Sequence, residues 1–385
     1  MNGLKIRRFE DDERLCVYGG AAVLIISIIG AFFSPAAFLR AYLIGYTFWA
    51  GLALGSLSIV LLHHLVGGDW GFITRRFMES AFGTLPLLAV LSIPILVNVS
   101  MLYPWADPEV VAESPVLQHK VPYLNVPFFI GRIVIYFAVW IGLSWMLNRW
   151  SLEQDQTADP LYVRRFRSVS GPALIVHAFM VTFAAIDLLK SLEPEWYSTI
   201  FGLIILVGQL LATMAFSIMM LMLLSDREPF TPVLRPVHFN DLGNLLLTFV
   251  VLFAYVEVSQ FIIIWHGNLP EEVPWYTRRS TNGWEYVTVL LVLFNFAVPF
   301  FLLLTRYVKQ RLRLLAWIAI SILVMRLLDY FWIVLPAFNL PAVGIHWMDV
   351  LVPVGIGGIW LAYFFWRLQR RPMLPLGDTR FVERV

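Results

Sequence analysis

The chain has 385 residues, of which 59% are hydrophobic and only 14% are charged. A soluble domain of this size cannot cover its surface with so few charged groups, so we expect a membrane protein with many spans. The single cysteine, Cys16, excludes an iron–sulfur cluster held by cysteines of this chain and a C-x-x-C-H site for covalent haem. We also expect no metal site and no nucleic-acid partner.

Apolar stretches long enough to cross a bilayer recur along the whole chain. No linker or repeat divides them, so the sequence predicts one all-α integral membrane domain over residues 1–385 with ten transmembrane helices. These lie near 15–33, 38–66, 77–103, 126–148, 169–189, 197–224, 239–265, 284–306, 313–335 and 347–367.

Prolines and loops divide these helices further. Pro86 and Pro94 are expected to kink the third helix, and Pro299 the eighth. The longer connections are expected at 104–125, 149–168 and 266–283.

The placement of Lys and Arg predicts the orientation. One side of the predicted bundle, which carries both termini, holds 21 of the 28 Lys and Arg residues, and the other side holds five. This bias predicts that both termini lie in the cytoplasm, and it favours an even number of spans. The other side is expected to carry an aromatic belt of Tyr103, Trp105, Tyr123, Trp196, Tyr197, Trp275, Tyr276, Trp284 and Trp347.

A carboxylate lies inside the apolar stretch 239–265. Glu257 and Gln260 are three residues apart, so they share one helix face. A carboxylate in hydrocarbon is costly, so this face is expected to contact protein, water or a partner. Glu257 has no basic neighbour in sequence, which favours a functional role over a packing role.

Other ionisable residues fall in the predicted spans. Arg132 and Asp187 are expected at the same depth on neighbouring helices, and Lys190 follows Asp187 by one turn. We predict structural ion pairs among these three. Arg326 and Asp329, in the middle of the ninth span, are also spaced for an ion pair, which is favoured because arginine does not release its proton.

Histidines need a separate interpretation. His177 is the only deep histidine, and proton transfer and packing are equally consistent with it; a haem held by two histidines is therefore not expected. The residues His63, His64, Arg75 and Arg76 are expected at the membrane surface, where contact with solvent and lipid headgroups is favoured.

Titratable groups thus occur at nearly every depth. One hypothesis is a proton relay, and the other is a set of dry ion pairs that only hold helices together. The candidates for proton transfer are His64, Glu79, His177, Asp187, Glu257, Arg326 and Asp329. Composition and spacing alone lead no further than a protein that handles protons in a membrane.

Several stretches resemble a known family. They are HHLVGGDWG (63–71), RRFMESAFGTLPLLAVLSIPI (75–95), YPWA (103–106), YLNVPFFIGRIVIYFAVW (123–140), SLEPEWYSTIFG (191–202), the segment 239–276 and LPLGD (374–378). With these stretches the chain resembles the ten-helix NrfD-like membrane subunits, most closely the ActF-type subunit (quinone-binding subunit 2) of bacterial alternative complex III.

The resemblance implies two four-helix bundles, spans two to five and six to nine, flanked by the first and tenth spans. It implies a subunit without a cofactor of its own in a complex that oxidises menaquinol or ubiquinol. Haem c and iron–sulfur clusters would belong to a multihaem cytochrome c subunit and an iron–sulfur subunit. A second NrfD-like subunit, small membrane-anchored subunits and lipids would be further partners.

Two other functions stay open. The chain could be an inert anchor of the same complex, or a proton-coupled secondary transporter. A transporter is expected to show internal repeats and broken helices near the midplane, and no repeat is visible in the sequence.

Overall fold

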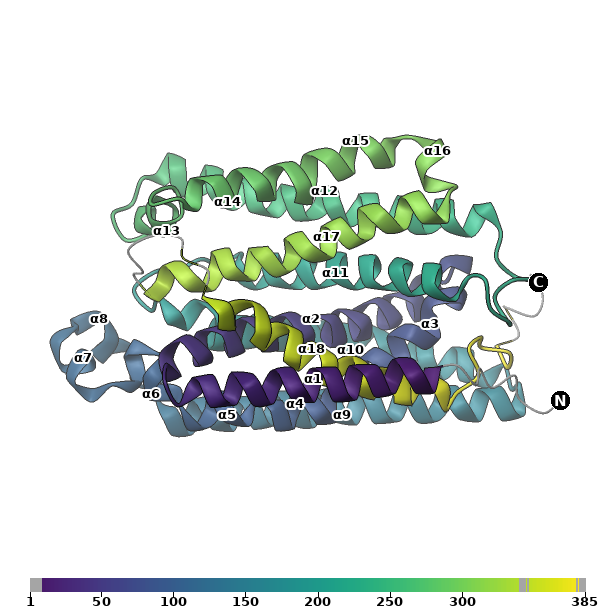
Figure 1. The fold of residues 1–385 in the computed structure, drawn as a ribbon, viewed down its shortest axis with the longest axis horizontal. Helices are drawn as coiled ribbons and strands as arrows, with labels where there is room; N and C mark the ends of the chain where they lie inside the picture. The colour runs from purple at the N-terminus through teal and green to yellow at the C-terminus, as the bar shows by residue number, and fades with distance from the viewer. Residues whose placement is uncertain (1–8, 339–343, 345, 379, 381–385) are drawn as a thin grey trace.

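The computed structural model describes residues 9–338, 344, 346–378 and 380. In this part of the chain the regular structure is entirely helical, and the long helices run side by side along one axis (Figure 1). Nine helical segments of the described residues are long and apolar enough to cross a membrane. The chain is therefore built as a multi-pass membrane protein.

The helices follow one another with short connections. The first half comprises α1 (Phe9–Ala31), α2 (Pro35–Val66), α3 (Asp69–Phe82), α4 (Leu85–Leu91), α5 (Ile93–Val97), α6 (Val99–Leu102), η1 (Pro104–Ala106), α7 (Pro108–Glu113), α8 (Pro115–Lys120), α9 (Val126–Thr157), α10 (Leu161–Leu188) and η2 (Lys190–Leu192). The second half comprises α11 (Phe201–Leu224), α12 (Pro236–Gly267), α13 (Val273–Arg278), α14 (Trp284–Leu291), the π-helical turn η3 (Val292–Ala297), α15 (Val298–Leu304), α16 (Arg306–Lys309), α17 (Leu312–Val334), η4 (Leu335–Phe338) and α18 (Trp347–Gln369).

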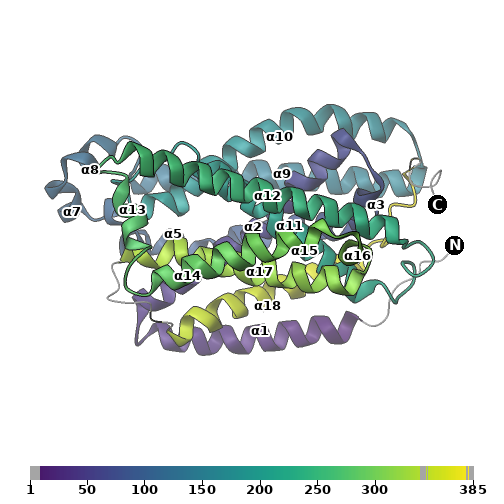
Figure 2. The same cartoon turned by 90° about the horizontal axis from the view of Figure 1, so that it is seen from above.

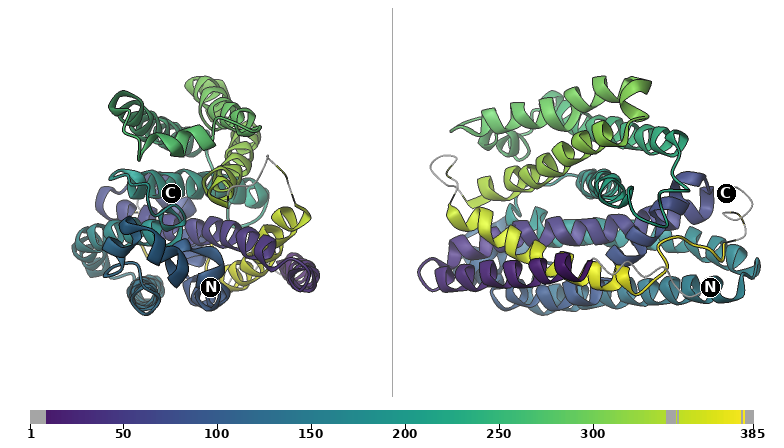
Figure 3. Two further views of the ribbon diagram at one scale, coloured as in Figure 1. Left: turned by 90° about the vertical axis from the view of Figure 1, so that its left-hand side faces the viewer. Right: turned by 45° about the vertical axis from the view of Figure 1, so that its right-hand side comes forward.

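Two helices form the centre of the molecule. α2 and α11 pack against each other and against most of their neighbours, and both are largely buried. They approach closely at Gly55, where a Cβ atom would lie 2.5 Å from the carbonyl oxygen of Gln209. In the end-on view, the green helices of the second half lie on one side of this centre and the blue helices on the other (Figure 3).

The first and last long helices lie together. α1 runs along α18 on the outside of the molecule (Figures 1 and 2). Gly20 and Gly358 face each other there, because a Cβ atom on either would come within 2.7 Å of the other's Cα atom. The apolar part of α1 that the structure describes in full, Cys16–Ala31, is shorter than each of the nine candidate spans and is not one of them.

The predicted breaks are confirmed, and one predicted loop is wrong. Pro86 and Pro94 begin the short helices α4 and α5, and Pro299 follows the π-helical turn. The stretch 149–168, expected to be a loop, is almost wholly helical, because α9 continues to Thr157 and α10 begins at Leu161. These helix ends are polar and extend past the apolar stretches, so they do not need a membrane to form.

We call the end of the molecule at which α9, α11 and α18 finish the basic end. The residues near it include most of the arginines of the described chain. The chain ends, 1–8 and 381–385, lie outside the described residues. The prediction that both termini lie at this end therefore falls partly outside the described residues.

The aromatic residues at the opposite end are not a belt as predicted. Five of the nine, namely Tyr103, Trp105, Trp196, Trp275 and Trp284, are at most 4% exposed. The rings of Trp196 and Trp275 stack at 4.0 Å, which joins the loop 193–200 to α13. These aromatic side chains form the interior of a structured cap. They pack on one another, so little of their surface is left to contact lipid.

Candidate functional site

A cluster of buried charges lies near the basic end. Glu79 on α3 accepts hydrogen bonds from Arg75 Nε (2.7 Å) and Arg76 Nη1 (2.6 Å), and Ser151 of α9 donates to it at 2.6 Å. Arg76 also contacts the carboxylate of Asp155. Both arginines and Glu79 are at most 1% exposed. The two cations and the carboxylates therefore compensate one another in a site closed to bulk water.

This burial corrects the expectation that the residues of the α2–α3 turn lie at the membrane surface. His63 and His64 are 2% and 3% exposed, and Arg75 and Arg76 are 1% and 0% exposed. Sequence reasoning placed them correctly at the end of the helices but missed what covers them.

Arg75 is covered by the C-terminal segment 373–378, which we call the strap. Met373 and Leu374 are buried, and Asp378 accepts a hydrogen bond from Arg75 Nη1 at 3.2 Å. Gly377 lies so close to α9 that a Cβ atom there would be 2.1 Å from the carbonyl oxygen of Gln154. Only glycine fits at position 377 so close to the Gln154 carbonyl oxygen. This glycine therefore lets the strap lie directly on α9 and close the cluster.

Asp378 ties the strap down through its negative charge. Burial alone would raise the pKa of the Asp378 carboxyl, but the guanidinium groups of Arg380 and Arg75 hold this pKa below its usual value. A carboxyl with a lowered pKa in the folded state stabilises the fold above its unfolded pKa, and this contribution is lost as the pH falls through the folded pKa.

We therefore expect Asp378→Asn to loosen the strap at neutral pH, with protease cleavage within 372–380 about tenfold faster than in the unmodified chain, as for a loss of about 1.4 kcal/mol. Limited proteolysis followed by mass spectrometry measures this. Acidification well below pH 4 is expected to produce the same loosening in the unmodified chain. Equal cleavage at neutral pH would contradict this role.

A polar pair continues inward from the cluster. His64 Nδ1 lies 3.2 Å from Ser170 Oγ of α10, and its ring stacks on Phe166 at 4.4 Å. The guanidinium of Arg75 also contacts the Phe166 ring, with its central carbon 4.9 Å from the ring centre. His64 and the charged cluster are thus neighbours through one aromatic ring.

A second polar pair lies deeper. His177 Nε2 and Ser58 Oγ are 2.7 Å apart, and His177 is completely buried. Its Nδ1 has no hydrogen-bond partner among the described residues. The ring of Trp140 meets it edge-on at 6.2 Å. His177 therefore has polar contacts with Ser58 and the backbone of Leu54, and its Nδ1 lacks a hydrogen-bond partner among the described residues.

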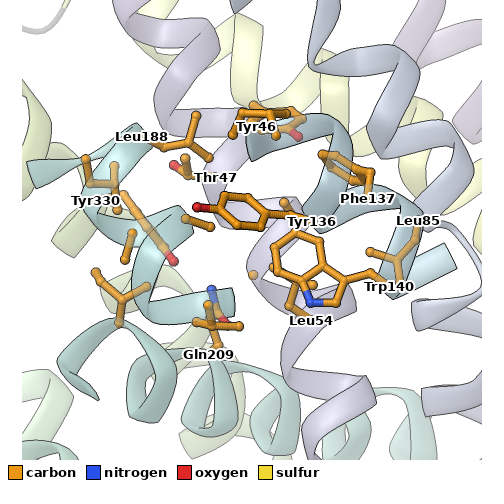
Figure 4. Close-up of a pocket in the computed structure, with 18 residues that line it drawn as sticks. Tyr46, Thr47, Leu54, Leu85, Tyr136, Phe137, Trp140, Leu188, Gln209 and Tyr330 are labelled. Carbon is orange, nitrogen blue, oxygen red and sulfur yellow. The ribbon is translucent and has the colours of Figure 1, made fainter. Parts of the chain in front are cut away.

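An internal cavity follows, between α2, α9, α10, α11 and α17. Its walls include Trp140, Tyr136, Gln209 and Tyr330, and the ring of Tyr136 lies across its centre (Figure 4). The space open to the centre of a water-sized molecule is about 40 Å³. About 10–15 Å³ is needed for each water, and the hydroxyl and amide groups supply polar partners, so the cavity suits a few waters.

Beyond the cavity lies the ion pair of Arg132 and Asp187, whose prediction is confirmed. Arg132 donates to both carboxylate oxygens of Asp187, at 2.9 and 2.8 Å, and Tyr136 donates to the same carboxylate at 2.9 Å. Arg132 also donates to the carbonyl oxygen of Tyr123 at 2.8 Å. So complete a set of partners makes Asp187 an anchor between α9 and α10.

Lys190 does not take part, which corrects its assignment as an ion-pair residue. It forms no ion pair with another described residue, and it lies in the turn η2 instead of continuing α10. The carboxylate of Asp187 already accepts hydrogen bonds from Arg132 and Tyr136. A spacing of one helical turn is therefore not sufficient for Lys190 to pair with Asp187.

A second group of candidates lies on the other side of the cavity. Arg326 Nη1 on α17 lies 3.0 Å from Asp329 Oδ2, as the spacing predicted. The guanidinium fills the space left by Gly208 and faces the ring of Phe253 at 4.2 Å. None of its three nitrogens has a well-aligned acceptor in the described part of the chain.

Glu257 belongs to this second group. Its carboxyl group interacts electrostatically with Arg326 and Asp329 across the contact of α12 with α17. It has no hydrogen bond or salt bridge to another described residue, unlike Gln260 one turn away, which bonds to Ser198 and Tyr276. Glu257 is thus the least constrained of the candidate carboxyl groups.

The sequence-predicted candidates therefore form two groups and not one. Glu79, His64, His177 and Asp187 lie on α2, α3 and α10, while Arg326, Asp329 and Glu257 lie on α12 and α17. The cavity separates them, and Gln209 and Tyr330 line it on the side of the second group.

Several site residues escaped the sequence analysis. Ser58, Ser170, Tyr136, Gln209 and Tyr330 are uncharged polar residues inside apolar helices, where such residues are common in membrane proteins. Their only signal is position: Ser170 and His177 are seven residues apart, so they share a helix face.

One buried arginine at the opposite end was also missed. Arg279 donates to Glu193 Oε1 at 2.8 Å and to the carbonyl oxygens of Trp332, Trp275 and Ile333 at 2.7–3.0 Å. Burial lowers the pKa of its guanidinium to about 10, which leaves it charged at neutral pH. It fastens the loop 266–283 to α17, and the signal was a basic residue in an acidic, aromatic loop.

Comparisons with known proteins found no family model and no curated protein that matches this chain.

Proposed function

We propose that this chain is the membrane-integral subunit of a quinol:electron-carrier oxidoreductase of the alternative complex III type. In this proposal it has ten spans in two four-helix bundles, lies in a bacterial inner membrane with both termini in the cytoplasm, and contributes a proton route. The support comes from the resemblance of the stretches quoted above and from the arrangement of the polar groups.

The observation that carries the proposal is the succession of polar groups along α9 and α10. In order from the basic end, α9 contributes Ser151 and Tyr136, and α10 contributes Ser170, His177 and Asp187. Ser170 and His177 are two turns apart, about 10 Å of rise. Waters must bridge such gaps, and His177 with its free ring nitrogen suits a proton carrier there.

The proton would leave this succession at the cavity. Asp187 has a full set of partners, so it is a poor exchanging group in this arrangement. Gln209 and Tyr330 line the cavity toward Arg326, and Glu257 lies beyond. In the proposed route Arg326 keeps Asp329 ionised, and Glu257 binds and releases the proton, because it has neither a hydrogen bond nor an ion pair to another described residue, whereas Arg326 and Asp329 pair with each other.

The cofactors would lie outside this chain. We propose that a multihaem cytochrome c subunit and an iron–sulfur subunit dock on the ordered segments 104–125 and 266–283, opposite the basic end. A second NrfD-like subunit and small membrane-anchored subunits would complete the complex. Menaquinol or ubiquinol would be the substrate of the complex, and this chain's part would be proton transfer and support.

The test is Glu257→Gln, which keeps the shape and removes the titratable group. We expect proton movement coupled to quinol oxidation to fall by about tenfold or more, at the low side of what a positioned proton-transfer group contributes. The measurement is proton release from proteoliposomes that contain the purified complex. Glu228→Gln, an exposed carboxyl group in the connection between α11 and α12, is the matched control and is expected to have no effect.

An inert anchor is the second candidate, favoured by the full pairing of Glu79 and Asp187. If Glu257→Gln leaves both quinol oxidation and proton movement intact, the anchoring function replaces the proton route. A purified assembly without haem and without a second NrfD-like chain would overturn the proposal as a whole and favour a transporter.

A further inference from the structure

A recess opens on the side of the molecule near the basic end, away from the succession of polar groups. It has a volume of about 370 Å³ and lies between the break after α3, the last turns of α9 and the end of α18. Its walls include Gly83, Pro86, Trp145, Asn148, Arg367 and Arg371.

The break in the third span creates this recess. The helix stops at Phe82, and Ser144 of α9 donates a hydrogen bond to the Phe82 carbonyl oxygen at 3.1 Å. Gly83 leaves room for the guanidinium of Arg367, whose Nε would be 2.2 Å from a Cβ atom at this position. The notch is therefore shaped around an arginine that comes from another helix.

The recess contains one arginine that no described carboxylate pairs with. Arg149, Arg367 and Arg371 line it, but Arg149 pairs with Glu153 at 2.8 Å and Arg371 lies 3.9 Å from Glu79, which leaves Arg367 without an ion pair among the described residues. Arg367 Nε is buried without a hydrogen-bond acceptor in the described part of the chain. A buried donor without an acceptor is costly, and an anion in the recess would supply one.

The walls are polar on one side and apolar on the other. Asn148 donates to Ser144 at 3.4 Å and accepts from Arg371, so the polar side is fixed by hydrogen bonds. Pro86 and Trp145 are exposed on the apolar side, and the Trp145 ring is 63% exposed. An occupant with an anionic head and an apolar tail fits this pattern.

We propose that the recess binds a phospholipid with an anionic headgroup from the leaflet that meets the basic end. Its phosphate accepts hydrogen bonds from Arg367 and from the neighbouring arginines, and an acyl chain lies along Pro86 and Trp145. Anionic lipids are attracted to clustered arginines next to a membrane span. The proposal depends on membrane embedding and not on the proton route.

The experiment uses a phosphatidylglycerol that carries a photoactivatable group in its acyl chain. The purified chain, in its complex, is reconstituted into phosphatidylcholine nanodiscs with a small fraction of this probe. After illumination, mass spectrometry identifies the labelled peptides. We expect labelling within 141–156 and 363–371, and we expect unlabelled phosphatidylglycerol, but not added phosphatidylcholine, to displace the probe.

Arg367→Gln removes the charge in the notch. We expect it to reduce this labelling about fivefold, as for one arginine at a membrane surface. Arg370→Gln is the matched control: its guanidinium is three residues away on the same helix end, stacks on Trp366 at 3.7 Å and does not line the recess. It is expected to leave the labelling unchanged.

Three outcomes would overturn the proposal. They are labelling that phosphatidylcholine displaces as well, an equal loss in Arg370→Gln, and displacement by menaquinone or ubiquinone but not by phosphatidylglycerol, which would make the recess a quinone site. If Arg367→Gln does not fold, the competition on the unmodified chain decides between these results.

Discussion

Glu79→Gln is expected to lower the free energy of unfolding by about 3–5 kcal/mol, because it leaves buried arginines without their carboxylate. Both Arg75 and Arg76 donate to Glu79, and Arg371 lies 3.9 Å from it. Glutamine retains one acceptor oxygen but supplies no negative charge. Unfolding in increasing amounts of sodium dodecyl sulfate, followed by tryptophan fluorescence, measures the loss.

The control for this result is Glu153→Gln. Glu153 accepts from Arg149 on the surface of α9, and the two side chains are 34% and 59% exposed. Water replaces an exposed partner at little cost, so the midpoint of unfolding is expected to stay the same. A similar shift in both variants would show that the buried cluster contributes no more than a surface pair.

Asp187→Asn is expected to lower the free energy of unfolding by about 3 kcal/mol, the low side for a broken buried pair. The carboxylate holds Arg132 through two hydrogen bonds and Tyr136 through a third. The loss is expected to stay at the low side because Arg132 keeps the Tyr123 carbonyl oxygen and ring as partners.

A double-mutant cycle with Arg132→Gln isolates the pair. The double variant is expected to be more stable than the sum of the two single losses predicts, because it leaves no unpaired charge. The same unfolding measurement applies. Strict additivity of the two losses would mean that the ion pair is not an energetic unit and that Asp187 is free for another role.

Comparing Glu79→Gln and Asp187→Asn with Glu257→Gln distinguishes residues that stabilise the fold from a residue that transfers protons. Glu79 and Asp187 have complete sets of partners, so their replacement is expected to act first on stability. Glu257 has no fixed partner, so its replacement is expected to act on proton movement while the fold remains. This contrast can be measured in one preparation of the complex.

The sequence predicted much of the local structure. The apolar stretches placed the long helices, because length and hydropathy alone decide whether a segment can cross a bilayer. The depth estimate placed Arg132 beside Asp187, and the breaks at Pro86 and Pro94 followed from the missing backbone donor of proline. These features depend only on residues that are close in sequence, or on the depth of a residue along the axis of the bundle.

The sequence did not predict which polar groups are covered. His64 and Arg75 were expected at a membrane surface, yet Phe166 of α10 stacks on His64, and the strap, about 300 residues further along the chain, closes over Arg75 through Asp378. Lys190 has the right spacing for Asp187 but finds the carboxylate occupied. Such outcomes depend on competition between distant partners, which no local pattern contains.

By itself, then, the sequence determined that this is a helical membrane protein and which residues carry charge within its apolar stretches. Only the tertiary structure decided how these charges are shared: Glu79 and Asp187 became anchors, and Glu257 remained without a fixed bond. The physical reason is that the hydropathy of a segment is a sum over neighbouring residues of the sequence. Whether a buried charge is paired depends instead on which side chains the tertiary structure places beside it.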